Sequence, residues 1–230
     1  MAVTFTSLAT PLASTANQST AYTATAGTAA SQDLLIAFVS TSGNTTAGTM
    51  AGGGLTWTLL TSQTKNAGAD ICAVYWAFAS TSVSVTPSYT PSAAATGCII
   101  SVIRVSGSTG SAAGPNLQQV TATATGTTAN PTVTFGSATL TDNGILLLIA
   151  NGTNSATQFT APTGFNEVIE VSYNTPANGA QVSERSTGGT ATTYTWTNAN
   201  TTSWRSFGLE FTAQVATSFD PMGMMGFFGL

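Results

Sequence analysis

The stretch Asp33-Leu34-Leu35-Ile36-Ala37-Phe38-Val39-Ser40-Thr41-Ser42-Gly43-Asn44 decides the fold of this chain, because it recurs as Asp142-Asn143-Gly144-Ile145-Leu146-Leu147-Leu148-Ile149-Ala150-Asn151-Gly152-Thr153-Asn154. Each copy holds an apolar run of strand length and ends in a turn that contains Gly and Asn. Such runs, bounded by turn residues, predict β-strands. The recurrence predicts a chain of two similar halves, each of about a hundred residues.

Other segments repeat in the same order, which favours a duplication over a chance similarity. Each half carries about seven strand-like segments on this reading. The matched pairs are 3–6 with 120–123, 21–25 with 131–135, 54–60 with 164–170, 70–78 with 180–186, and 99–105 with 205–211.

Strand candidates follow one another at short intervals, and no amphipathic helical stretch interrupts them. Thr and Val are enriched, as is typical of pleated strands, and clusters of Gly, Asn, Asp and Ser between the candidates predict turns. The sequence therefore predicts an all-β chain. The candidates are residues 3–8, 21–25, 34–40, 55–62, 70–79, 83–89, 98–105, 119–125, 132–135, 145–150, 165–173, 179–185, 192–197 and 204–211.

Two architectures satisfy this pattern. We expect a jelly-roll-like antiparallel β-sandwich with internal pseudo-duplication, to which both halves contribute. The alternative is two tandem seven-stranded sandwiches, joined by the short Ser, Gly and Ala segment at 108–115. The predicted organisation is a first β repeat at 1–112, a second β repeat at 113–213 and an apolar C-terminal tail at 214–230.

Charged residues are scarce in this chain, and their scarcity limits the classes of partner that it can bind. Charged residues make up 5% of the sequence, the net charge is −4, and Lys65, Arg104, Arg185 and Arg205 are the only basic residues. Because no basic patch can form, we expect no nucleic-acid or membrane partner. Few Lys or Glu residues remain to protect sheet edges, so we expect the protein to work in an assembly.

The first residues carry no basic segment followed by an apolar one, so we expect no signal peptide and synthesis in the cytoplasm. The longest apolar runs, such as 145–150, are far too short to span a membrane.

The C-terminal tail breaks the strand pattern, since glycines alternate with bulky apolar residues and no charged residue follows Asp220. One interpretation is that it covers the open end of its own sandwich. The other is an assembly peptide, in which methionines fill an irregular groove and glycines allow close approach of the backbone. The predicted assembly residues are Phe219, Pro221, Met222, Met224, Met225, Phe227, Phe228 and Leu230.

Enzymatic chemistry has few candidates. The sequence contains no histidine, which excludes Ser-His-Asp and Cys-His catalysis and imidazole metal sites. A carboxylate pair of the glycosidase type would have to come from Glu167, Glu170, Glu184 and Glu210. A hairpin around 174–178 would instead place Glu167 near Arg185, as a cross-strand ion pair, and Glu170 near Glu184, as two solvated carboxylates. Asp142-Asn143-Gly144 fits a turn better than a calcium site. We expect no catalytic, cofactor or metal site.

Aromatic and sulfur-containing side chains have core interpretations that outweigh the functional ones. A sugar-stacking platform would need exposed rings, whereas strand-borne Trp normally packs in the core. Cys72 and Cys98 lie in apolar strand-like runs and are expected to be buried free thiols, with a disulfide as the alternative. The rings in question are Trp57, Trp76, Trp196, Trp204, Tyr75, Tyr89, Tyr173 and Tyr194.

Several sequence segments resemble those of β-sandwich proteins of tailed bacteriophage virions, namely head-decoration, head-fibre and minor tail proteins. They are 34–40, then Gly53-Gly54-Leu55-Thr56-Trp57-Thr58-Leu59, a Tyr-Trp-Ala strand at 75–77, and Ala161-Pro162-Thr163-Gly164-Phe165. The resemblance covers roughly residues 20–212 and implies a structural role in a virion. It transfers no catalytic residue.

The expected function is therefore that of a non-enzymatic virion protein, which decorates a phage capsid or tail and is anchored through its apolar tail and sheet edges. Its partners would be copies of itself and other virion proteins. One alternative is a carbohydrate-binding or host-adhesion module that binds a host surface glycan. Another is a surface filament subunit.

Overall fold

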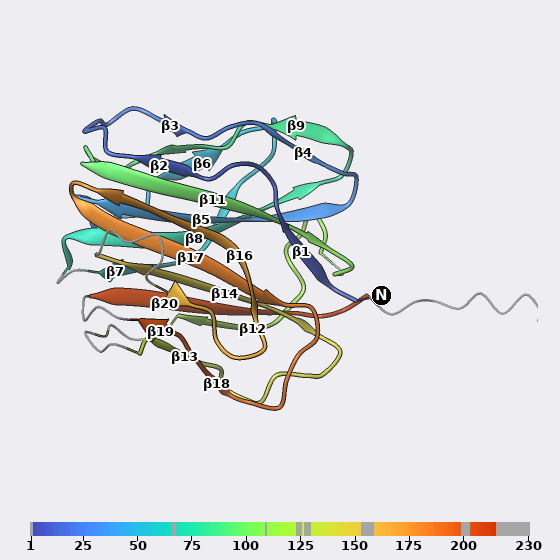
Figure 1. Cartoon of the computed structure of the whole chain (residues 1–230). Helices are drawn as coiled ribbons and strands as arrows, with labels where there is room; N and C mark the ends of the chain where they lie inside the picture. The colour runs from blue at the N-terminus through green and yellow to red at the C-terminus, as the bar shows by residue number, and fades with distance from the viewer. Residues whose placement is uncertain are drawn as a thin grey trace, which may run out of the picture.

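The computed structural model describes residues 2–65, 68–108, 110–122, 126, 130–152, 159–198 and 203–214. Within these ranges the regular elements are β-strands, all paired antiparallel (Figure 1). The all-β sandwich predicted from the sequence is confirmed, while the jelly-roll connectivity stays a prediction.

The first half is built on one large sheet, with strand order β1-β11-β5-β8-β7 and β2 paired to β11 beyond the end of β1. Two small sheets, β3-β10-β6 and β4-β9, lie over its outer face (Figure 1). The strands are β1 (Thr4–Ser7), β2 (Leu12–Ser14), β3 (Tyr22–Thr23), β4 (Gly27–Ala29), β5 (Asp33–Ser42), β6 (Thr49–Ala51), β7 (Thr58–Lys65), β8 (Asp70–Ala79), β9 (Val83–Val85), β10 (Ser88–Thr90) and β11 (Gly97–Ser106).

The second half repeats this plan, with a large sheet of order β12-β20-β14-β17-β16 and the small sheets β13-β18 and β15-β19. Its central strands β14 and β5 are the two copies of the recurring sequence. The strands are β12 (Leu117–Ala122), β13 (Thr132–Thr134), β14 (Gly144–Asn151), β15 (Phe159–Thr160), β16 (Asn166–Asn174), β17 (Ala177–Arg185), β18 (Thr193–Thr195), β19 (Thr197–Asn198) and β20 (Trp204–Phe211).

A β-bulge recurs at the same place in both halves and aligns them. The β7–β8 register shifts between Leu59 and Thr61, and the β16–β17 register shifts between Glu167 and Ile169. Leu59 is therefore equivalent to Glu167. Following the registers inward makes Leu35 in β5 equivalent to Ile145 in β14. A bulge kept in both copies marks a local feature of the fold rather than a defect.

This alignment corrects three of the sequence matches. Residues 58–59 correspond to 166–167, so the predicted match of 54–60 with 164–170 is shifted by two positions. For the same reason Asp70 corresponds to Asn178, so the predicted match of 70–78 with 180–186 begins two residues late in the second half. The predicted match of the first strands, 3–6 with 120–123, is shifted by more than two positions. Thr6 lies opposite Arg104, and Gln119 lies opposite Glu210, the residue equivalent to Arg104, so Thr6 corresponds to Gln119. Loops and edge strands differ in length between the halves, whereas the central strands keep their register.

The two large sheets pack face to face, and their facing side chains form one core shared by both halves. This core includes Phe38 from β5 and Phe207 from β20, whose ring centroids are 6.0 Å apart. A second core lies under the small sheets of the first half, and a third lies under those of the second half. The layers follow one another from top to bottom in Figure 1. The two halves thus form one body.

Reciprocal contacts relate the halves by an approximate two-fold axis. β1 and β2 of the first half lie against β16, and β7 lies against β12 and β20. Since β1 corresponds to β12, β11 to β20 and β7 to β16, the β1–β16 contact has its counterpart in β12–β7, and the β11–β16 contact has its counterpart in β20–β7. This is the arrangement of an isologous dimer interface, here within one chain.

Several of the shortest strands escaped prediction, because two or three residues carry no period. β2, β4, β6 and β15 were absent from the candidates, and 83–89 divides into β9 and β10 at Thr86-Pro87. Proline cannot donate a ladder hydrogen bond, so the strand breaks there. The Gly52-Gly53-Gly54 turn before β7 has positive φ at all three glycines.

Candidate assembly site at one end of the sandwich

The first and last described residues, Ala2 and Gln214, lie at the same end of the sandwich, where β5 and β14 begin (Figure 1). The last described residues are fixed there, since the backbone N–H of Gln214 donates to Gly107 O at 2.8 Å and Ala213 forms a β-bridge with Ser108. The segment 215–230 therefore starts from a fixed point. We call this region the terminal end.

Two hollows flank Gln214 at the terminal end, and Gln214 lines both. The larger, of about 660 Å³, is also lined by Ala2, Leu140, Thr141, Asp142, Asn143, Ser186, Thr187, Thr212 and Ala213. The smaller, of about 600 Å³, is also lined by Ala30, Ser31, Gln32, Asp33, Arg104, Ser106, Gly107, Ser108 and Gly110.

The two hollows are equivalent parts of the duplicated fold, because each contains the turn that leads into the first central strand of its half. These turns are 30–33 and 140–143, and each closes with a hydrogen bond from its last N–H to its first carbonyl. Leu140 is 52% exposed in the larger hollow. An exposed leucine beside the start of segment 215–230 offers an apolar contact to a peptide.

Arg104 and Asp33 in the wall of the smaller hollow, and Glu210 near the larger one, are held by neighbouring groups. Arg104 Nε donates to Asp33 Oδ2 at 2.7 Å, and Ser106 Oγ donates to Asp33 Oδ1 at 3.0 Å. Glu210 is fully buried behind the larger hollow and accepts hydrogen bonds from Leu140 N, Asn143 Nδ2 and Gln119 Nε2. The larger hollow thus combines the carbon surface of Leu140 with one exposed carboxylate, Asp142, and the smaller hollow is lined mainly by polar residues.

The predicted assembly residues, Phe219, Pro221, Met222, Met224, Met225, Phe227, Phe228 and Leu230, all lie outside the described residues. The structure places only the point from which they continue.

The four glutamates considered for acid–base chemistry fall into separate surroundings. Glu210 is the buried group described above, and Glu184 accepts from Asn166 Nδ2 at 2.8 Å and from Ser186 Oγ at 3.1 Å. Glu167 accepts from Gln181 Nε2 at 3.0 Å, and Glu170 accepts from Phe159 N at 3.2 Å. Each of the four glutamates thus accepts at least one hydrogen bond from a neighbouring group.

The predicted cross-strand neighbours of these glutamates are wrong. The two-residue turn at Thr175-Pro176 and the bulge beside Val168 place Glu167 opposite Ser183 and Glu170 opposite Gln181. Glu167 therefore does not face Arg185 across the ladder. A one-residue bulge decides this register and leaves no mark in the sequence pattern.

The eight aromatic side chains considered for sugar stacking are all buried or half-buried. Trp196 is fully buried and donates from Nε1 to Gln181 Oε1 at 3.0 Å. Trp57 packs half-buried against the outer core of the first half and donates to Gly52 O at 3.2 Å. The prediction of core packing is confirmed for these residues.

Cys72 and Cys98 are free and buried, as predicted. They sit on strands either side of β5 and face opposite sides of the sheet, Cys72 toward the shared core and Cys98 toward the outer core. This orientation rules out a bridge between them. Burial raises the pKa of both thiols, which keeps them protonated and unreactive.

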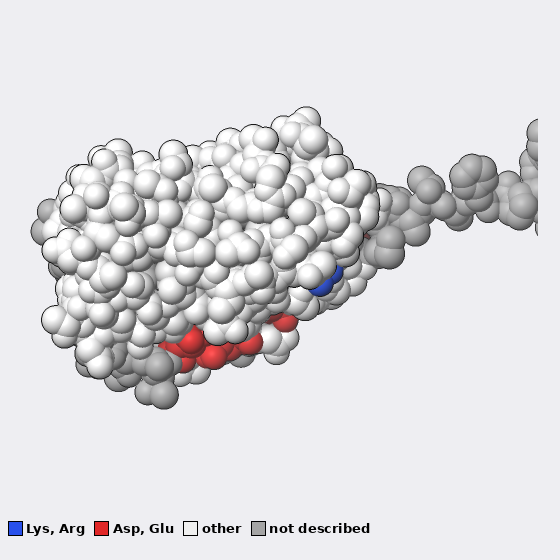
Figure 2. Space-filling view, turned by 90° about the horizontal axis from the view of Figure 1, so that it is seen from above, with Lys and Arg blue, Asp and Glu red and all other residues white. Residues whose placement is uncertain are grey.

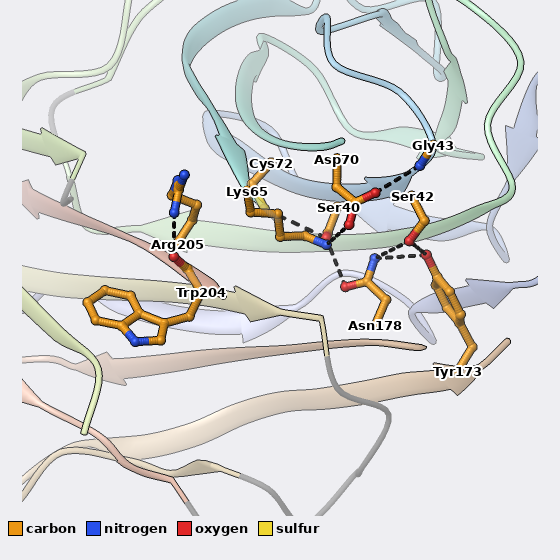
Figure 3. A network of polar contacts seen from close by, with 10 residues as sticks. All are labelled: Ser40, Ser42, Gly43, Lys65, Asp70, Cys72, Tyr173, Asn178, Trp204 and Arg205. Carbon is orange, nitrogen blue, oxygen red and sulfur yellow. Dashed lines mark hydrogen bonds and ion pairs between the residues drawn. The ribbon is translucent and has the colours of Figure 1, made fainter. Parts of the chain in front are cut away.

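The opposite end of the sandwich contains a polar network between the two large sheets, which we call the inter-sheet network (Figure 3). Lys65 Nζ contacts Asp70 Oδ2 at 3.2 Å with the lysine side chain fully buried. Asp70 also accepts from Gly43 N at 2.8 Å. Burial of such a pair is tolerated because its hydrogen bonds are satisfied.

The same network also contains the second-half residues that are equivalent to Lys65 and Asp70, and these residues join the two halves. Asn178 Nδ2 donates to the Tyr173 hydroxyl at 2.8 Å, Ser40 Oγ donates to Asn178 Oδ1 at 3.1 Å, and the hydroxyls of Ser42 and Tyr173 lie 3.0 Å apart. Lys65 and Tyr173 are equivalent residues, as are Asp70 and Asn178. Burial raises the pKa of Tyr173 despite these hydrogen bonds.

Sequence reasoning missed the inter-sheet network. A lysine in a chain with so few cations, followed five residues later by an aspartate across a tight turn, was the available signal. Arg205 lies near this network, 4% exposed, with Nη1 donating to Trp204 O at 2.8 Å. Burial lowers its pKa.

Across the described ranges, no helix is long and apolar enough to cross a membrane, and no group of three or more metal-binding side chains is found. Comparison of the chain with protein-family models, with curated proteins and with solved structures returned no match.

Proposed function

We propose that this protein is a non-enzymatic structural protein of a virion, of the tailed-phage type it resembles. In this role it decorates a capsid or tail and attaches through its C-terminal tail and its sheet edges. One observation carries the proposal. The chain leaves the sandwich between two equivalent hollows at the terminal end and continues into a segment with no charge after Asp220.

The packing of the body supports this role. A core shared by two large sheets, with a further core on each outer side, joins the two halves into one unit. Most of the surface in Figure 2 is neither acidic nor basic, and the acidic groups gather along one margin. Uncharged surface of this kind removes a usual barrier to close packing of copies.

The carbohydrate-binding alternative receives no comparable support. It requires several Trp or Tyr rings exposed on one face, and the eight candidates are buried or half-buried where the structure describes them. The filament alternative uses the same apolar tail and differs only in the particle that is built.

The test compares the full chain with a chain ending at Gln214, by light scattering and thermal melting. The members of all three cores lie before residue 214, so the shortened chain is expected to keep its melting temperature. We expect the full chain to form larger assemblies than the shortened one. A full-length variant carrying Phe227→Ser and Phe228→Ser is the matched control, because it keeps the tail length and removes its largest apolar groups.

The opposite outcome is equally informative. If shortening lowers the melting temperature and leaves the particle mass unchanged, the tail belongs to the core of its own domain. The assembly role would then be abandoned in favour of a binding module.

A further inference from the structure

The two duplicated edge strands, β7 and β16, differ in charge at equivalent positions. Leu59 in β7 corresponds to Glu167 in β16, and Ser62 corresponds to Glu170. Charged side chains on an edge strand oppose pairing with another chain. The β16 edge is therefore protected by two carboxylates, while the equivalent positions of the β7 edge carry none.

Two exposed apolar side chains lie on the strands of the unprotected side. Among the described residues, three large hydrophobic side chains are exposed, and two of them, Leu59 (45%) and Val120 (43%), lie on β7 and β12. β12 is the outermost strand of the second large sheet and lies against β7. This flank thus presents two neighbouring sheet edges with a leucine and a valine at the surface.

The backbone of β7 is available for pairing on its outer side. Within the described part of the chain, β7 pairs with β8 alone. Its one cation, Lys65, is fully buried against Asp70 and cannot act as a guard. The bulge beside Leu60 bends the start of the strand and leaves 61–65 as a regular segment. An outer edge with free N–H and C=O groups can add a strand from a partner.

We propose that the β7 edge pairs with the β7 edge of a second copy of this chain, in antiparallel fashion about a two-fold axis. Two uncharged edges approach without repulsion, whereas two β16 edges would bring four carboxylates together. The chain already associates its own halves through reciprocal contacts of this symmetry. This inference rests on the proposed structural role and names the partner for its sheet edges.

The test uses cross-linking that reports this edge alone. Gln63 is exposed in β7, and we expect Gln63→Cys in the full chain to form a covalent dimer with a short bismaleimide. Asn166→Cys, exposed on β16 with both carboxylates retained, is the matched control and should not cross-link. The natural cysteines are buried and should not react.

Adding Leu59→Glu and Ser62→Glu to Gln63→Cys copies the protection of β16 and should reduce the cross-linked fraction at least tenfold, with the melting temperature retained. Equal cross-linking with and without these glutamates, or none in Gln63→Cys, would overturn the proposal.

The same cross-linking in the chain ending at Gln214 separates this inference from the proposed function. A cross-link that persists while the larger assemblies are unaffected by shortening means that only the role of the tail fails. Larger assemblies that depend on the tail, with no cross-link at residue 63, mean that only the edge pairing fails.

Discussion

Arg104 and Glu210 occupy equivalent positions with opposite charge. Arg104 lies opposite Leu35, and Glu210 lies opposite the equivalent Ile145. Arg104 pairs with Asp33 at 2.7 Å, while Glu210 accepts from Asn143, the residue equivalent to Asp33, at 2.9 Å. Both halves keep a hydrogen bond between these two positions. The carboxylate belongs to Asp33 in the first half and to Glu210, at the other position, in the second.

In each half the carboxylate caps the same backbone group. Asp33 Oδ2 accepts from Ala30 N at 2.6 Å, and Glu210 Oε1 accepts from Leu140 N at 2.7 Å. The requirement of the fold at this point is an acceptor for the N–H that begins the turn, because a buried donor without a partner is costly. Either strand can supply it.

The first prediction concerns Glu210. Glu210→Gln places an amide where three donors converge, and one donor loses its acceptor, so we expect a loss of about 1–3 kcal/mol in the free energy of unfolding. Urea unfolding at neutral pH measures it. Glu167→Gln, at an exposed side chain, is the control and should change stability by less than about 0.5 kcal/mol. Equal effects at the two sites would contradict the assigned role of Glu210.

The second prediction concerns the buried pair in the inter-sheet network. Lys65→Met leaves Asp70 as a buried charge without its cation, and we expect a loss of about 3–5 kcal/mol. The double variant Lys65→Met with Asp70→Asn should recover much of this loss, since the equivalent pair in the second half is the uncharged Tyr173 and Asn178. Denaturant unfolding of both variants checks this. A double variant no more stable than the single one would argue against the assignment.

The third prediction concerns the close approach of the two halves. A Cβ on Gly97 would lie 2.8 Å from the Tyr173 ring of the other half, whereas a Cβ on Gly152 would meet nothing within 4 Å. Gly97→Ala should therefore destabilise the protein by about 1–3 kcal/mol through overpacking. Gly152→Ala should lie within about 0.5 kcal/mol of the natural protein. Thermal melting of the pair gives the comparison.

The fourth prediction concerns alkaline pH. Burial raises the pKa of Cys72, Cys98, Tyr75, Tyr89 and Tyr173 above their ordinary values of 9.0 and 10.0. The unfolded chain loses these protons first, so the folded state holds more protons there and stability falls as pH rises. We expect full stability from these groups below about pH 9 and progressive loss above it.

Urea midpoints at several pH values, combined with the ultraviolet absorbance of tyrosinate, measure this effect. Tyrosinate from the three buried tyrosines should develop together with unfolding. Their ionisation near pH 10 in a protein that keeps its native circular dichroism would contradict the burial of these rings.

The sequence by itself determined the long strands and the duplication. The apolar runs of β5 and β14 carry the strand signal locally, and the turn residues around them mark their ends, so neither needs distant contacts to be recognised. The burial of Trp196 and of both cysteines followed from the same local pattern.

The tertiary structure alone decided how the halves meet. The Ser40–Asn178 and Ser42–Tyr173 contacts join residues 138 and 131 positions apart, and the bulges that fix the outer registers leave no periodic trace. The difference between the β7 and β16 edges became visible only once the alignment of the halves was known. These features depend on which faces pack together, because a side chain's surroundings are set by strands that are distant in sequence.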